Sequence, residues 1–281
     1  MTHSFSSLED YAKCPRFYYL KRILKNWPPG TIDQLLGTMY HAAFAALGLR
    51  PELNPEALAK EILSAHAPQI RALGHHPEWY ETEYIAVLTS IAPLFGPGKL
   101  EPFVHEGQPM IERKFYDEAL GFNGVIDFVS KNTPLLANGH VTGWQPDVAC
   151  VLDFKATGSL KRRKTQADTD SSDQLNLYLH KTGFEIAGFI DIFRGDPSDI
   201  RIRLTKPPPE EVAKWKTWFE DTRACMDLIA GQTEKRFFPM CHRSNKLCCP
   251  MWCHFYRHCY DGVPLDKLND PYYTVSGGPT T

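Results

Sequence analysis

The chain has 281 residues, of which 43% are hydrophobic and 12% aromatic, so we expect a large folded core, and global disorder is disfavoured. Lys and Arg number 31 against 33 Asp and Glu, a net charge of −2, so any nucleic-acid binding must depend on local basic patches or bound metal. No run approaches about 18 apolar residues and no apolar segment follows a basic start, so we expect a cytoplasmic protein without a signal peptide or membrane partner.

The first hundred residues carry mainly helical patterns. Ser6 and Glu9 have the spacing of a capping box, which predicts a short helix that stops before Pro15. Further helices are expected at about 16–25, 32–49, 55–66 and 78–95, because Pro and Gly separate these amphipathic stretches.

Strand patterns begin near residue 110. We predict strands at 110–115, 124–129, 148–155 and 189–193. The segment 130–147 has the composition of a loop, and 158–172 that of a polar, mobile connection. Helices are predicted at 174–182 and at about 210–230, where Gly231 ends the second one.

Two predicted strands carry acidic residues. Asp153 and Lys155 share one face of their strand because side chains alternate, while Phe154 points into the core. Asp127 follows the apolar residues Val125 and Ile126 in the strand at 124–129. A divalent cation held by both carboxylates beside the lysine would remove the cost of burying these charges, and it would favour phosphodiester hydrolysis. The alternative is an ion pair between Asp153 and Lys155, with Asp127 at a turn.

These acidic strands belong to an ordered set of motifs. The set is Ser6-Ser7-Leu8-x-x-Tyr11-x-x-Cys14-Pro15, Gly37-Thr38-x-x-His41, Gly124-x-Ile126-Asp127, Asp153-Phe154-Lys155 and Gln174-Leu175-x-x-Tyr178. Over residues 6–260 it resembles the RecB-like nuclease family of the PD-(D/E)xK superfamily, which includes the AddB nuclease domain and the CRISPR-associated iron–sulfur exonucleases. Each motif alone is weak, and the specificity lies in their order.

The resemblance implies a fold and a metal site. The fold is an α/β restriction-endonuclease-like core, with a mixed central sheet flanked by helices and a helical N-terminal part. The implied ligands of Mg²⁺ or Mn²⁺ are Asp127, Asp153, His41 and the backbone carbonyl of Phe154. Lys155 would position the attacking water. Gln174 and Tyr178 lie four residues apart and therefore share one helix face. The resemblance implies that both line the active site and contact DNA. Glu112 is an additional candidate carboxylate.

Cysteines gather near the C-terminus. The chain contains eight, and five of them lie in the last 41 residues. In a reducing compartment, Cys249, Cys253 and Cys259 have spacings that suit ligands of one metal ion or cluster, with Cys14 as a fourth. The resemblance implies a [4Fe–4S] cluster held by these four residues, which we expect to be mainly structural. Cys248 is an alternative to Cys249, and the residues also permit zinc.

A basic run, Lys161-Arg162-Arg163-Lys164, follows the strand of Lys155 and is predicted to grip DNA phosphates. The alternative is a solvated basic loop. The domains expected are a helical part at 1–100 with Cys14 and His41, a nuclease core at 101–235, a cysteine clasp at 236–262 that packs with the N-terminus, and a flexible tail at 263–281.

The predicted activity is metal-dependent exonucleolytic hydrolysis of DNA, on single-stranded ends. The resemblance implies 5′ to 3′ polarity and a setting in CRISPR adaptation or in phage or host recombination and repair, with protein partners in such a complex. Alternatives are a non-catalytic module of the same fold that binds DNA ends, and a zinc-clasped interaction protein. The sequence contains no Walker A pattern, so any ATP-driven step would require a partner.

Overall fold

The structure is a computed structural model that describes residues 3–118, 120–229, 231, 232, 234, 238, 253–261 and 263–269. The chain forms two compact units. Unit 1 comprises Met1–Pro29, Glu118–Asn123 and Thr217–Thr281, and unit 2 comprises Gly30–Asp117 and Gly124–Lys216. Cys14 and His41, which the sequence analysis assigned to one N-terminal part, therefore belong to different units.

Unit 2 is built on a mixed sheet. Its strands are β4 (Ile111–Asp117), β5 (Phe122–Ser130), β8 (Cys150–Thr157), β9 (Ala187–Phe193) and β10 (Ile200–Thr205). They follow the order β5-β8-β9-β10, and β4 also pairs with β5. The β5–β8 and β9–β10 pairs are antiparallel, whereas β8 and β9 are parallel. The predicted strands are confirmed, and β10 is an addition that the sequence analysis did not predict.

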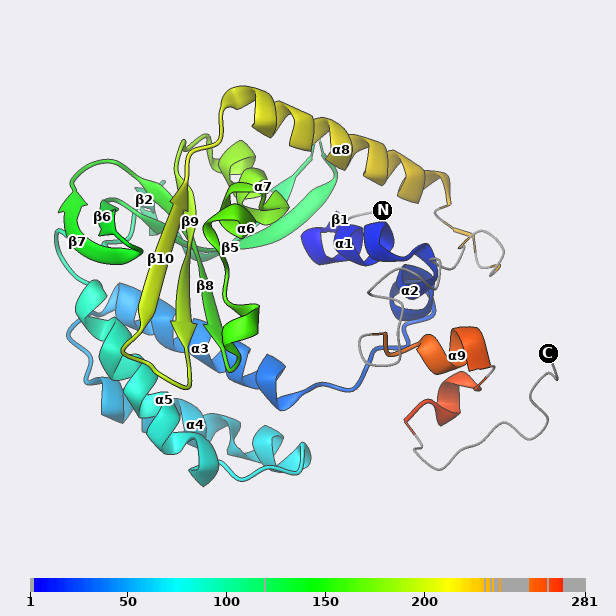
Figure 1. Ribbon diagram of the computed structural model, residues 1–281, viewed down its shortest axis with the longest axis horizontal. Helices are drawn as coiled ribbons and strands as arrows, with labels where there is room; N and C mark the ends of the chain where they lie inside the picture. The colour runs from blue at the N-terminus through cyan, green and yellow to red at the C-terminus, as the bar shows by residue number, and fades with distance from the viewer. Residues whose placement is uncertain are drawn as a thin grey trace. The chain divides into compact units, whose positions relative to one another are not determined.

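Helices cover both faces of this sheet. The helices α3 (Ile32–Leu49), α4 (Pro55–Ala72) and α5 (Glu78–Ile91) lie together against one face, and α5 ends in a short turn at Ala92–Leu94 (Figure 1). On the other face, α7 (Asp173–Thr182) packs on β8 and β9. Among the described residues, no helix has both the length and the apolar composition that crossing a membrane requires.

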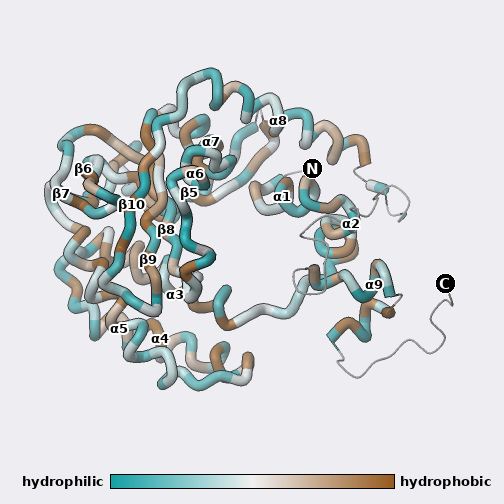
Figure 2. The backbone as a smooth tube through the Cα atoms, in the orientation of Figure 1, coloured by the Kyte–Doolittle hydropathy of each residue, from teal (hydrophilic) through white to brown (hydrophobic). Residues whose placement is uncertain are grey.

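Alternation of side chains determines which residues form the core. Phe154 of β8 lies within 4.9 Å of the ring of Phe44 on α3 and within 6.1 Å of Phe128 on β5, measured between centroids. The strands and helices of this unit carry both hydrophobic and hydrophilic residues, as the tube in Figure 2 shows. The neighbours of Phe154 in sequence, Asp153 and Lys155, consequently point to the opposite face, where α7 lies.

Two connecting segments contain more regular structure than the sequence analysis expected. The segment 130–147 is not a loop but a hairpin of β6 (Thr133–Ala137) and β7 (His140–Gln145). Asn138 and Gly139 make its turn with φ values of 54° and 83°, which suit the type I′ turn that such a pair favours. The segment 158–172 contains a helical turn at Leu160–Arg162 and the helix α6 (Gln166–Asp170), which Thr165 caps.

Unit 1 brings together three parts of the chain. The helices α1 (Phe5–Lys13) and α2 (Pro15–Tyr18) continue into a π-helical turn at Tyr19–Ile23, and β1 (His3–Ser4) pairs in parallel with the start of β5. The second half of α8 (Pro209–Leu228) adds Phe219, whose ring contacts Phe122 at 5.1 Å between centroids. The helix α9 (Tyr256–Asp261) and a turn at Leu265–Lys267 follow.

The N-terminal helix begins two residues earlier than predicted. Ser4, not Ser6, is its cap, and the side chains of Ser4 and Ser7 satisfy each other's backbone amides in a capping box. The helix predicted at 16–25 is replaced by α2 and the π-helical turn, after a break at Cys14 that Pro15 enforces.

Candidate active site

The register of two strands brings two acids together. Phe128 pairs with Leu152 and Val129 with Val151 across the antiparallel β5–β8 ladder. The next residues in this register are Asp127 and Asp153. Asp127 Oδ2 accepts a hydrogen bond of 3.0 Å from the backbone amide of Phe154, and both carboxylates are buried. The two predicted acidic residues are therefore neighbours in the structure.

A histidine and a second carboxylate complete a cluster around Asp127. His41 of α3 places Nδ1 3.1 Å from Glu112 Oε1 and 3.4 Å from Asp127 Oδ2. One potential ligand atom from each of these three residues lies within 4.8 Å of the others. Among the described residues this is the group of His, Cys, Asp and Glu side chains that lies close enough to hold one metal ion.

Glu112 reaches this cluster through an unusual backbone. Its φ is 45°, in the left-handed region, although it lies near the start of β4. Non-glycine residues enter this region at a cost of roughly 1 kcal/mol or more, and such residues gather at functional sites. The sequence analysis raised Glu112 only as an additional carboxylate, because nothing local in Ile111-Glu112-Arg113 indicates this conformation.

Burial and neighbouring charges together shift the pKa values of two groups in the cluster. Burial, followed by the charge of Asp153, raises the pKa of Asp127 to about 8, against the lowering effects of His41 and Lys155. Burial alone would lower the pKa of His41, but its hydrogen bond to Glu112 and the charges of Asp127, Glu112 and Asp153 outweigh burial and raise it. Asp127 thus tends to hold a proton until a positive charge compensates it.

The chemistry of this donor set fits a divalent cation. His41, Glu112 and Asp127 offer one imidazole nitrogen and carboxylate oxygens, which are donors that Mg²⁺ and Mn²⁺ accept. Asp153 Oδ2 is also buried and makes no hydrogen bond among the described residues, although it lies 2.5 Å from Lys155 Nζ. A cation beside these oxygens would compensate the negative charge of the neighbouring carboxylates.

Lys155 and Gln174 contact Asp153, and Tyr178 contacts Gln174. Lys155 Nζ contacts Asp153 Oδ2, while the amide of Gln174 donates a hydrogen bond of 2.7 Å to Asp153 Oδ1. The same amide donates to the hydroxyl of Tyr178 at 2.7 Å, and Tyr178 donates to the carbonyl of Val125 at 2.8 Å. Burial raises the pKa of Tyr178, so its hydroxyl stays protonated as a donor. Gln174 thereby fixes the orientation of the Asp153 carboxylate.

A cavity of about 550 Å³ opens beside this centre. His41 and Lys155 line it together with two further cations, Lys164 and Arg194. The amine of Lys164 lies 5.4 Å from the ring centroid of Phe189, and Arg194 is held by Asp33 at 2.6 Å. The sequence analysis did not single out Arg194, because a lone arginine after a strand carries no motif.

The described side chains of the basic run, those of Lys161, Arg163 and Lys164, lie in different surroundings. Arg163 binds Asp199 and the backbone of Asp191, and only 12% of its side chain is exposed. Its guanidinium is thus committed within the protein. Lys164 lines the cavity and Lys161 is exposed, whereas the side chain of Arg162 lies outside what the structure describes.

The predicted cysteine ligands fall in unit 1. Cys14 caps α2 by accepting the amide of Phe17 at 3.4 Å, and Cys253 and Cys259 are half-buried near α9. Phe17 contacts Phe255 at 5.3 Å between centroids, so the turn that carries Cys14 packs on the segment of Cys253. Cys248 and Cys249 lie outside the described residues. No described cysteine belongs to a group of metal-ligand side chains close enough for one ion.

Comparison with known proteins gives two kinds of similarity. Residues 2–260 match the model of the PD-(D/E)XK nuclease superfamily. The thymidylate kinases of Chlamydia caviae and Chlamydia felis are 27% and 25% identical to this chain over 116 and 115 residues, which is 40% of the chain in both cases. The chain spans about half the length of these curated relatives, 55% of each.

Proposed function

Because this chain belongs to the PD-(D/E)XK nuclease superfamily, we propose that it is a divalent-metal-dependent nuclease that hydrolyses phosphodiester bonds of DNA. The observation that carries the proposal is the meeting of His41, Glu112 and Asp127 beside the Asp153–Lys155 pair. Crowded acids next to a lysine, at the edge of a cavity, are the arrangement that metal-assisted hydrolysis requires.

In this proposal Asp127, Asp153, His41 and Glu112 hold Mg²⁺ or Mn²⁺, together with the carbonyl of Phe154. The bound cation would activate water and neutralise charge on the phosphate. Lys155 orients the water and donates to the phosphate oxygens, since its amine lies on the cavity side of Asp153.

The residues on α7 act as supports. Gln174 prevents rotation of the Asp153 carboxylate through its amide hydrogen bond, and Tyr178 locks Gln174 in place by accepting from the same amide. Each group is positioned by a neighbour that is itself hydrogen-bonded, as efficient catalysis requires.

We propose single-stranded DNA ends as the substrate, cut from 5′ to 3′, on the strength of the resemblance to the RecB-like family. Lys164 supports this proposal, because it lines the same cavity as Lys155 and its amine makes no hydrogen bond or ion pair with the described residues. Lys161, Arg162 and Arg163 remain part of the predicted DNA-binding run, with Arg163 in a supporting position. Protein partners in CRISPR adaptation or recombination remain a prediction.

The decisive test is cleavage of labelled single-stranded DNA with Mn²⁺ or Mg²⁺. We expect cleavage by the wild type and its loss in Asp153→Asn and Lys155→Ala. Asp147→Asn is the matched control, because this acid of unit 2 is exposed and pairs only with surface Lys131 among the described residues. Absence of cleavage by the wild type with any divalent ion would overturn the proposal. DNA binding without cleavage would then favour the non-catalytic module.

We propose separately that Cys14, Cys249, Cys253 and Cys259 hold a [4Fe–4S] cluster, with Cys248 as the alternative to Cys249. The packing of Phe17 on Phe255 supports it, because this contact brings the two cysteine-bearing segments together. Purified protein should be brown and absorb near about 400 nm, and Cys14→Ser should lose this absorbance. Zinc without iron in the purified protein would replace this proposal with a zinc clasp.

We do not extend the similarity with thymidylate kinases to a kinase activity. The sequence contains no G-x-x-x-x-G-K-[ST] motif, which P-loop kinases use to hold phosphates.

A further inference from the structure

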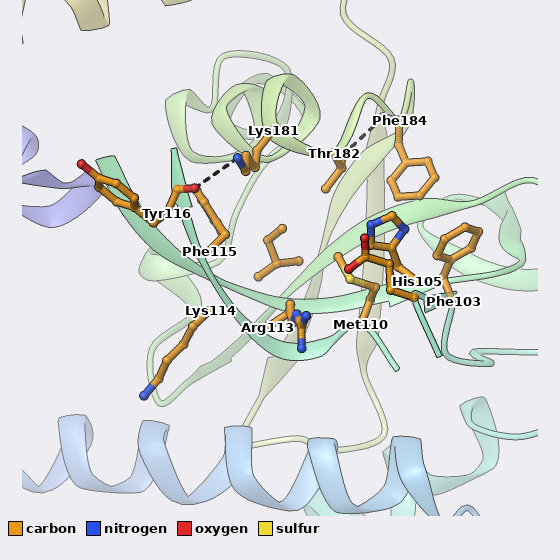
Figure 3. A pocket seen from close by; sticks show the side chains of 12 residues that line it. Phe103, His105, Met110, Arg113, Lys114, Phe115, Tyr116, Lys181, Thr182 and Phe184 are labelled. Carbon is orange, nitrogen blue, oxygen red and sulfur yellow. Dashed lines mark hydrogen bonds between the residues drawn. The ribbon is translucent and has the colours of Figure 1, made fainter. Parts of the chain in front are cut away.

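A second cavity, of about 430 Å³, lies in unit 2 beside β4. Its walls come from β4, from the end of α7 and from the tight hairpin of β2 (Val104–His105) and β3 (Gln108–Pro109). Figure 3 shows Phe103, His105 and Phe184 gathered at one end and Phe115 and Tyr116 at the other. Nothing in the site described above accounts for this cavity.

The cavity shares two strands with the acidic centre. Arg113 lines it and directly follows Glu112 on β4, while Ile126 lines it and directly precedes Asp127 on β5. Among the described strands β4 pairs only with β5, so β4 forms an edge of the sheet around which a flexible polymer can pass. A ligand that spans both places would therefore be a chain, not a compact molecule.

Aromatic rings give the cavity a flat apolar end. Phe103 and Phe184 meet at 5.1 Å between centroids with their planes at 77°. Both side chains are only half-buried although they are large and apolar. Half-exposed rings that line a cavity suit stacking with a planar base, which is a sequence-tolerant way to hold single-stranded nucleic acid.

Positive charge lies between the aromatic groups. Arg113 is half-buried, and its guanidinium makes no hydrogen bond or ion pair within the part of the chain that the structure describes. Lys181 lies 5.8 Å from the ring centroid of Phe115 and is partly neutralised by Asp117 at 3.2 Å. Glu106, at the tip of the hairpin, is the carboxylate among the described lining residues. The cations lining the cavity thus outnumber its acids, which favours an anionic ligand.

We propose that this cavity binds one nucleotide of a single-stranded nucleic acid, outside the nucleotides at the scissile bond. The base stacks face-on against Phe184, with Phe103 at its edge, and Arg113 binds the adjoining phosphate. The inference rests on the proposed nuclease function, because it identifies the bound chain as the substrate strand. A duplex does not suit this cavity, since its bases are stacked on one another.

Binding without cleavage tests this inference. The probe is a fluorescent 12-nucleotide single strand, compared with a series in which each position in turn lacks its base, and affinity is measured by anisotropy in EDTA. For the wild type we expect one position, or two adjacent ones, at which loss of the base weakens binding about fivefold or more. In Phe184→Leu, and separately in Phe103→Leu, this penalty should disappear at the same position.

A charge variant gives an independent measurement. Arg113→Gln should weaken binding of every probe about threefold to tenfold and reduce the slope of log affinity against log salt by about one. Arg50→Gln is the matched control, because Arg50 is an exposed arginine of the same unit that lines neither cavity, and it should bind as the wild type does.

The outcomes separate this inference from the proposed function. If the wild type cleaves the 12-nucleotide strand with Mn²⁺ and yet shows no position at which Phe184→Leu removes the effect of losing a base, the inference is overturned. That result would leave the nuclease proposal standing. An effect of Arg113→Gln no larger than that of Arg50→Gln would also overturn it. The expected binding pattern without cleavage would support the cavity and reject the nuclease.

Discussion

Asp127→Asn should stabilise the metal-free protein at pH 7 and abolish its activity. Asp127 is buried, and burial with the charge of Asp153 raises its pKa to about 8 from an ordinary value of 3.8. Below pH 4 the acid is protonated in both states. As the pH rises, the unfolded chain releases this proton while the folded chain retains it, so stability falls until the folded pKa is passed.

The pKa sets the size of this effect. Between 3.8 and pH 7 the loss is roughly 4 kcal/mol at most, because each pH unit corresponds to about 1.4 kcal/mol for a single proton. Asparagine resembles the protonated acid, and its side-chain oxygen still accepts from the amide of Phe154. We therefore expect a gain of about 1 to 4 kcal/mol, or at least about 2 °C in Tm.

Thermal unfolding in EDTA, followed by circular dichroism, measures the gain. Saturating Mn²⁺ should raise the Tm of the wild type and leave that of Asp127→Asn nearly unchanged, because binding to the folded state alone stabilises it. The exposed Asp147→Asn should change neither value appreciably. If metal-free Asp127→Asn is less stable than the wild type by about 1 kcal/mol or more, the inference that burial and the charge of Asp153 destabilise ionised Asp127 is refuted.

Two further variants test the surroundings of the site. Arg163→Ala should destabilise the protein by about 2 to 4 kcal/mol in urea unfolding, because the buried carboxylate of Asp191 loses one of its cationic partners. The control is Lys161→Ala, at an exposed position, which should change stability by less than about 0.5 kcal/mol. Gly188→Ala should cost about 2 kcal/mol or more, because an added Cβ would lie 2.3 Å from the carbonyl oxygen of Arg203 on the paired strand.

Each of these variants has a result that contradicts its premise. Arg163→Ala with wild-type stability but weakened DNA binding would return Arg163 to the DNA-binding surface that the basic run predicted. Gly188→Ala with wild-type stability would mean that β9 and β10 can separate locally without cost, which the backbone pairing of Gly188 with Leu204 argues against.

Local patterns predicted the fold where one periodicity dominates. The helix expected at 32–49 is α3, and the strands expected at 124–129 and 148–155 lie within β5 and β8, allowing for their ends. The hairpin of β6 and β7 was missed although its Asn138-Gly139 turn is a strong local signal, because Pro, Gly and Thr around it have the composition of a loop.

The site was predictable in its residue types and less so in its geometry. Asp153 and Lys155 share a strand face, and Gln174 and Tyr178 a helix face, because strand alternation and helix periodicity are local rules. The approach of Asp127 to Asp153 depends on the register between β5 and β8, which pairs residues far apart in the sequence. Arg163 appeared equivalent to its basic neighbours, and only the fold supplies Asp191 and Asp199 as its partners.

Glu112 shows most clearly why sequence alone could not complete the site, and it provides a test of its own. Its φ of 45° is imposed by packing, since Glu has no local preference for that region. In an ordinary strand, alanine is more stable than glycine by about 0.5 to 1 kcal/mol. At this position we expect the reverse order, with Glu112→Gly more stable than Glu112→Ala by about 1 kcal/mol in metal-free unfolding, because glycine relieves the left-handed strain. Both variants should bind Mn²⁺ more weakly than the wild type by calorimetry. If alanine is instead the more stable, the left-handed backbone at Glu112 is wrong, and with it the geometric reason for counting this carboxylate among the metal ligands.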